Sequence, residues 1–250
     1  MHHGHALYDF QGSWGDGQSN VPKWLLQFLS VDTFHRVTDV RLTHKTKHMP
    51  ETWTALASLP HLRQLYSDNT TIQSESFRKV RALKKLESIW ISNVVFDDAS
   101  IQSLASLQEL RIVVIHQGKL TDSSLEVFAR LPNLTALSLE GSFSNEGLVT
   151  ISEASNLAEL SLFGDGSTID DDGIQHLAKL RKLRSISLDN SKITGDGLRQ
   201  FASLKSLRKL SVGKTNVTWD DIEFFKKDLR PDVGVHGVYR TNRTQINSTE

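Results

Sequence analysis

Apolar residues along this chain follow a compound pattern, in which a strand-like segment is followed by a helix-like one. The stretch 183–204 shows both parts. Its first half has the spacing LxxLxL between Leu183 and Leu188, which is typical of a short strand. Its second half places apolar side chains three residues apart from Leu198 to Leu204, as on one face of a helix. Neither half can bury its apolar face alone, so the pattern predicts that units of the same kind stack against one another.

The strand segment recurs eight times. Successive segments begin 25, 24, 21, 27, 23, 26 and 24 residues apart, and their first positions are Val37, Leu62, Leu86, Leu107, Leu134, Leu157, Leu183 and Leu207. Repeats of about 20 to 29 residues with this spacing are the sequence signature of leucine-rich repeats. The chain therefore resembles the leucine-rich repeat family over roughly residues 34–229.

Within that family, the chain looks like the ribonuclease-inhibitor and F-box-associated kinds, because a true helix signature follows each strand, as in 120–131 and 193–204. The LPNL motif of 131–134 looks most like bacterial members. The resemblance implies an α/β fold, a leucine-rich repeat solenoid (horseshoe). Its parallel β-sheet would lie on the concave face and its α-helices on the convex face.

We expect three parts along the chain. Residues 1–33 form an N-terminal leader with a capping helix, 34–230 form the eight repeat units, and 231–250 form a C-terminal edge strand and a disordered tail. The segment 22–29 has its apolar side chains on one helical face, so it suits a cap over the core edge of the first strand.

Spacing inside the units predicts local differences. From the strand start to the first buried helix residue there are 15 residues in three units, but 18 in the unit that begins at Leu107 and 17 in the one that begins at Leu157. This predicts longer loops at 113–119 and 163–168. Only six residues separate Ile101 from the next strand start, against nine elsewhere, which predicts a helix shortened by about a turn.

A small polar residue precedes each later helix and predicts an N-cap, because its side-chain oxygen can accept a hydrogen bond from a free backbone amide. These residues are Thr121, Ser144, Asp170, Thr194 and Thr218. Gly147, Gly173 and Gly197 recur one residue before the first buried helix position. A close approach of helix to sheet would explain them.

Composition excludes several classes of function. The 29 basic residues balance 29 acidic ones, which argues against a nucleic-acid or anionic-membrane role that rests on bulk positive charge. Without cysteine there is no disulfide, thiolate zinc site or cysteine nucleophile. We found no GxSxG, HExxH or P-loop motif, so we expect no catalysis, metal site or cofactor.

The longest wholly aliphatic run, 112–115, is far shorter than the roughly 20 residues of a membrane-spanning helix. Residues 1–17 lack the apolar segment of a signal peptide. We therefore expect no direct membrane insertion and a cytoplasmic location by default. The flank before the repeats, from Tyr8, also resembles that of bacterial repeat proteins commonly tethered by an N-terminal membrane helix. A tethered envelope protein thus stays an alternative.

Side chains between the core positions of a strand point away from the core, onto the concave sheet. There, Tyr66 and Trp90 are expected on adjacent strands with Arg111 next along, a trio with the character of a binding hot spot. Exposed aromatics on strands can also reflect strand propensity and cross-strand pairing. A smaller acidic patch on the later strands consists of Glu140, Glu159 and Asp189. We predict a partner-binding set that adds one loop aromatic and two carboxylates of this patch: Tyr66, Trp90, Arg111, Glu140, Phe163 and Asp189.

These features predict a monomeric, non-catalytic scaffold that binds a protein or peptide on its concave face. Two alternatives stay open. One is a substrate-recognition adaptor of the F-box, ubiquitin-ligase type, although 1–32 is short and polar for an F-box module. The other is a structural or envelope-associated ectodomain.

Overall fold

The computed structural model describes residues 6–7, 37–42, 50–68, 74–92 and 97–237. Within them, ten strands form one sheet, and each strand pairs in parallel with its neighbours along the chain. The strands are β1 (Ala6–Leu7), β2 (Asp39–Leu42), β3 (Gln64–Asp68), β4 (Ser88–Ser92), β5 (Ile112–Leu120), β6 (Ala136–Gly141), β7 (Glu159–Phe163), β8 (Ser185–Ser187), β9 (Lys209–Ser211) and β10 (Gly234–His236).

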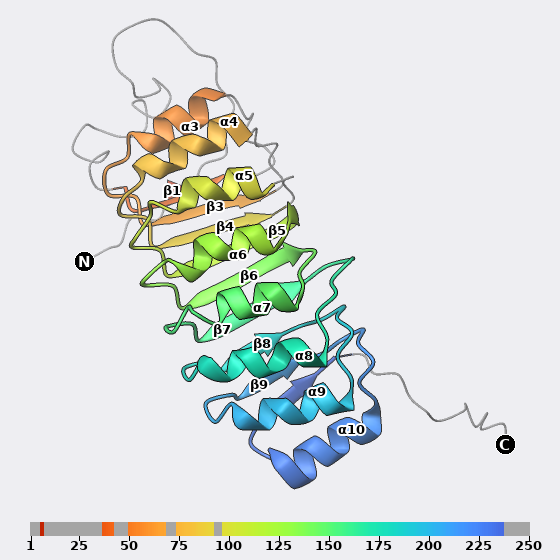
Figure 1. Ribbon diagram of the computed structural model, residues 1–250. Coiled ribbons are helices and arrows are strands. Elements are labelled where there is room, and N and C mark those ends of the chain that lie inside the picture. Colours follow the sequence, from red (N-terminus) through yellow and green to blue (C-terminus); the bar gives the residue numbers. More distant parts are fainter. Residues whose placement is uncertain (1–5, 8–36, 43–49, 69–73, 93–96, 238–250) are drawn as a thin grey trace, which may run out of the picture.

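Helices line one side of this sheet in chain order, as Figure 1 shows. They are α3 (Pro50–Ala57), α4 (Ser74–Phe77), α5 (Asp98–Ile101), α6 (Asp122–Ala129), α7 (Asn145–Ile151), α8 (Asp171–Ile174), α9 (Gly195–Gln200) and α10 (Trp219–Phe224). Four of them continue directly as 3-10 turns at Arg78–Ala82, Gln102–Leu104, Gln175–Lys179 and Phe201–Ser203, and α10 continues as a π-helical turn at Phe225–Leu229. The predicted α/β solenoid, with parallel strands on the concave face and helices on the convex face, is confirmed.

The core lies between the two layers. Alternate strand residues such as Leu137 and Leu139 in β6 are at most 2% exposed and face the helices, whereas Ala136, Ser138 and Glu140 between them are half-buried on the other face. This alternation follows from the pleat of a strand. It leaves one row of side chains on the concave surface for each strand.

One strand start was placed wrongly by the sequence pattern. Val113 pairs with Ile89 of β4, so the unit starts at Leu110 and not at Leu107. The distance between successive unit starts is then 24 residues both from Leu86 to Leu110 and from Leu110 to Leu134. The shortened helix and the long loop at 113–119 disappear with this correction, because β5 itself runs through that segment. The loop at 163–168 does follow a strand, since β7 ends at Phe163.

The five predicted N-caps are confirmed. Thr121, Ser144, Asp170 and Thr194 each accept a hydrogen bond from the backbone N–H two residues on, and Thr218 accepts one from Asp221. Each bond satisfies an amide that the first turn of a helix leaves unpaired.

From α5 to α8, the first residue inside each helix links that helix to the next one. Asp98 of α5 accepts hydrogen bonds from the N–H of Thr121 at 3.0 Å and from its hydroxyl at 2.6 Å. Asp122 of α6 accepts the same pair from Ser144, and Asp171 of α8 accepts it from Thr194. These three N-caps are thereby held by a carboxylate of the preceding unit. Asp170 is held in the same way by the side-chain amide of Asn145 in α7.

This link explains the recurrent glycines. A Cβ at Gly147 would collide with the Asp122 carboxylate, and one at Gly197 would collide with the Asp171 carboxylate. The close neighbour of these glycines is therefore a side chain of the preceding helix, and the expected close approach to the sheet does not explain them.

The link reverses at the last helix. Gly195 starts α9 and has no carboxylate to offer, so Asp221 of α10 accepts hydrogen bonds from the N–H and hydroxyl of its own N-cap, Thr218, at 3.0 and 2.6 Å. The Asp221 carboxylate lies where a side chain on Gly195 would be.

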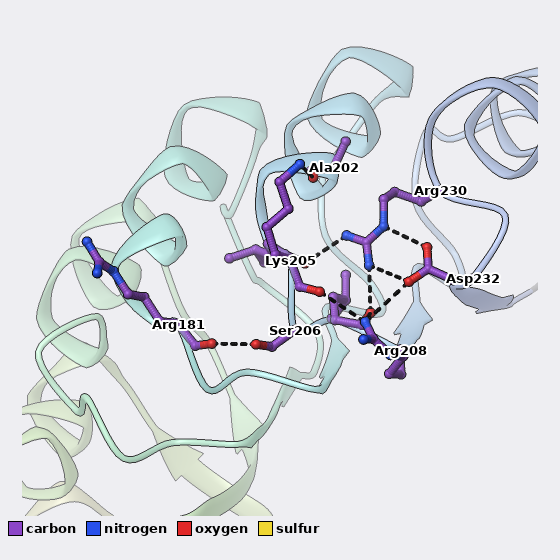
Figure 2. Close-up of polar contacts among 9 residues, drawn as sticks. Arg181, Ala202, Lys205, Ser206, Arg208, Arg230 and Asp232 are labelled. Carbon is purple, nitrogen blue, oxygen red and sulfur yellow. Dashed lines mark hydrogen bonds and ion pairs between the residues drawn. The ribbon is translucent and has the colours of Figure 1, made fainter.

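A buried arginine connects the last turn to the preceding unit (Figure 2). Arg230, 7% exposed, donates to the carbonyl oxygens of Leu204 at 2.7 Å and Leu207 at 2.8 Å. Its guanidinium also pairs with Asp232, at 2.8 and 3.0 Å, and Asp232 contacts Arg208 at 3.2 Å. β10 then pairs with β9 at the end of the sheet.

The predicted capping helix at 22–29 and the predicted tail at 241–250 lie outside the described residues.

Candidate functional site

The concave face carries a row of side chains in strict register, one from each of the strands β2 to β9. Parallel pairing places each member directly beside the next, and strands lie about 4.8 Å apart. The row runs through Arg41, Tyr66, Trp90, Val114, Ser138, Ser161, Ser187 and Ser211. Its first part is cationic and aromatic, and its later part consists of small hydroxyl side chains.

Tyr66 and Trp90 stack face to face across β3 and β4. Their ring centroids lie 4.3 Å apart and the planes differ by 5°. The Arg41 guanidinium lies over the Tyr66 ring, 4.8 Å from its centroid, in a cation–π contact. Since Tyr66 lies between β2 and β4, both of its faces are covered, and Trp90 has one face left on the β5 side.

That free face of Trp90 lines a groove of about 440 Å³. Val114 and Ala136 contribute to the groove, as do the small side chains Ser161 and Ser187 of β7 and β8. The lining residues come from strands β4 to β8, so the groove runs across the strands and not along them. Small side chains after Trp90 leave room for a ligand to lie against the sheet.

Arg111 does not lie beside Trp90, which corrects the predicted trio. Register pairs Trp90 with Val114, and Arg111 is an exposed residue just before β5. Its carbonyl oxygen accepts hydrogen bonds from the N–H groups of Thr135 and Ala136 at the start of β6. The cation of the aromatic stack is Arg41, which lies on the opposite side of Tyr66.

The three carboxylates of the predicted acidic patch differ in their hydrogen-bond partners. Glu140 accepts a hydrogen bond from the N–H of Gln117 at 2.8 Å. Asp189 accepts from the hydroxyls of Ser187 and Ser211 at 2.9 Å and from the N–H of Gly213. Glu140 is therefore bound to β5 and Asp189 to the turn after β9, and both carboxylates already have partners.

Glu159 is the third carboxylate of the patch. It is exposed, it lines the groove, and its side chain has no hydrogen bond or ion pair within the described part of the chain. It is the acidic group of this surface that stays available to a ligand.

Phe163 lies at the end of β7 beside Glu140 of β6. It meets the His116 ring edge-on, with centroids 5.2 Å apart at 72°. His116 Nε2 lies 3.1 Å from the Ser138 hydroxyl. The pattern missed His116 and Val114 as members of this face, although a regular 24-residue step would have found both.

No protein-family model matches this chain, and no curated protein matches it. Among solved structures, it resembles internalin C2 of Listeria monocytogenes, with a TM-score of 0.57 and 17% identity over 83% of this chain and 83% of that chain. It also resembles internalin F of the same organism, with a TM-score of 0.54 and 16% identity over 88% of this chain and 74% of that chain.

These internalins are leucine-rich repeat proteins. The chain folds as a leucine-rich repeat solenoid. At these identities the likeness shows the fold alone, so the function of this chain has to be argued from its own surface.

Among the described residues, no group of three or more His, Asp or Glu side chains could hold a metal ion. None of the described helices is long and apolar enough to span a bilayer.

Proposed function

We propose that this chain is a non-catalytic scaffold that binds a protein or peptide in the groove of its concave face. One observation carries the proposal: Trp90 is stacked on one face and lines an open groove of about 440 Å³ with the other. Tryptophan, tyrosine and arginine are the residues that most often dominate binding energy at protein interfaces.

The aromatic stack favours binding because it orders Trp90 before the partner arrives. Tyr66 on one side restricts the indole, so little side-chain freedom is lost on association. The groove crosses the strands β4 to β8, a shape that suits a polypeptide better than an enclosed small substrate. The likeness to internalins supports a protein-binding repeat scaffold in general.

We also propose that the repeats are of the ribonuclease-inhibitor and F-box-associated kinds. True helices on the convex face, such as α6 and α7, support the ribonuclease-inhibitor and F-box kinds.

The proposal is tested by truncating the anchor. Proteins retained from a lysate of the source cell are identified, and the affinity of each purified partner is measured for wild type and for Trp90→Ala. We expect a loss of at least about 2 kcal/mol, roughly 30-fold, because an anchor lost from the interface leaves its contacts unmade.

Trp219→Ala is the matched control, because Trp219 is an aromatic residue that is 50% exposed on α10, outside the groove. Equal affinity of wild type and Trp90→Ala for every partner would remove the concave groove as the binding site.

A further inference from the structure

The surroundings of the groove differ from one side to the other. Beyond its β4 end, at β2 and β3, the Arg41 guanidinium lies over Tyr66. At β7, the exposed Glu159 carboxylate lines the groove. Between the two ends lie the free face of Trp90 and a row of small, uncharged side chains. A ligand in this groove would therefore meet an aromatic surface and an acidic group in a fixed order.

Trp90 favours an uncharged ring over a cation. Arg41 already serves as the cation of the aromatic pair, one strand beyond Tyr66, and its charge weakly opposes a second cation on the free indole face. A proline or aromatic ring loses little on leaving water and packs well against an indole face. The Trp90 position therefore selects an apolar ring.

Glu159 favours a basic side chain. Glu140 and Asp189 already accept backbone N–H groups, so Glu159 is the carboxylate of the three that can take a new partner. An arginine or lysine would form a charge-assisted hydrogen bond with it.

The distance between the two positions sets the spacing in the ligand. Trp90 in β4 and Glu159 in β7 are three strand separations apart, about 14 Å. Glu159 also lies about two residues before the Trp90 row along the strand direction, because register connects it through Ala136 and Ile112 with Ser88, so the two positions are about 16 Å apart. Four residues of an extended chain rise about 14 Å, and the long side chain of an arginine or lysine covers the remainder. Because alternate side chains of an extended chain point to opposite sides, residues i and i+4 face the same way.

Building on the proposed function, we propose that the groove selects an extended peptide segment with a proline or aromatic ring on Trp90 and an arginine or lysine four residues away on Glu159. Arg41 lies two strands beyond the Trp90 end of the groove, so the basic residue of the ligand belongs at the Glu159 end.

A random dodecapeptide library displayed on phage, selected against the full chain, tests this inference. Enriched sequences should pair a ring residue with Arg or Lys four positions away. A synthetic peptide from this set is then titrated against wild type, Trp90→Ala and Glu159→Gln. We expect Glu159→Gln to weaken binding about tenfold, and to have no effect on a peptide whose basic residue is replaced by Gln.

Glu126→Gln on α6 is the control, since it removes the same charge from the convex side. Glu159→Lys should in turn bind a peptide that carries Glu in place of the basic residue. If Trp90→Ala weakens the peptide and Glu159→Gln does not, the charge inference is wrong while the groove survives. If no peptide is enriched, or if neither variant weakens it, both the inference and the proposed function are overturned.

Discussion

At the scale of single residues, Asp232 gives the molecule a pH-dependent contact. The hydrogen bond from the Arg230 guanidinium lowers the pKa of Asp232 from 3.8 to about 2. The folded chain thus binds the proton more weakly than the unfolded chain does. The contact stabilises the fold fully above pH 4, and its contribution is lost as the pH falls toward 2.

We therefore expect Asp232→Asn to be less stable than wild type in urea unfolding at pH 6, and this difference to shrink as the pH falls from 4 to 2. Asp165→Asn, in the exposed loop after β7, is the control for the loss of one surface charge. A difference that stays constant from pH 6 to pH 2 would show that the ionised carboxylate does not contribute.

At the scale of elements, the link between α9 and α10 is a reversed copy of the links between earlier helices. From α5 to α8, an aspartate or asparagine at the first helical position faces a small residue at the third position of the next helix, as Asp171 faces Gly197. Between α9 and α10 the order is Gly195 and Asp221. Exchanging the two residues should restore the common arrangement.

Gly195→Asp alone places a second carboxylate against Asp221, and Asp221→Gly alone leaves the Thr218 N–H and hydroxyl without their acceptor. Each should cost about 1 to 3 kcal/mol of unfolding free energy. The double variant should recover to within about 1 kcal/mol of wild type, measured by urea unfolding. If the losses of unfolding free energy of the two single variants simply added in the double variant, an exchanged Asp and Gly would not restore the link between α9 and α10.

Local elements were largely predictable from sequence, and the contacts between them were not. The N-caps followed from residue type alone, as at Thr121 and Thr218. That Asp98 would hold Thr121 could not be predicted, because the two helices meet only after stacking.

The sequence pattern wrongly predicted Arg111 as the neighbour of Trp90, because strand register also depends on contacts between units. Leu104, Leu107 and Leu110 are three residues apart and all fully buried, so the sequence fits two overlapping LxxLxL registers. Pairing of Val113 with Ile89 selects the second register. It moves Arg111 off the concave face and brings Val114 beside Trp90, a choice that local pattern cannot make.

At the scale of the whole molecule, each unit pairs only with the units before and after it in the sheet. A solenoid of this kind has stability that is close to a sum of unit and interface contributions, so an end can open while the middle stays folded. Leu137 in β6 and Leu210 in β9 hold the same core position of their strands and are 2% and 1% exposed. Substitutions at these two leucines therefore compare a unit in the middle of the solenoid with a unit near its end.

Truncation of either leucine to alanine should leave a similar cavity, at a cost of about 2 to 5 kcal/mol. In hydrogen exchange, we expect Leu210→Ala to expose the amides of β9, α10 and β10 and to leave those of α5 to α7 protected. Leu137→Ala should raise exchange in units on both sides of β6, because its loss weakens two interfaces at once. If Leu210→Ala raised exchange evenly over 97–237, the units would unfold as one cooperative body, and the connection through Arg230 would carry stability across the whole sheet.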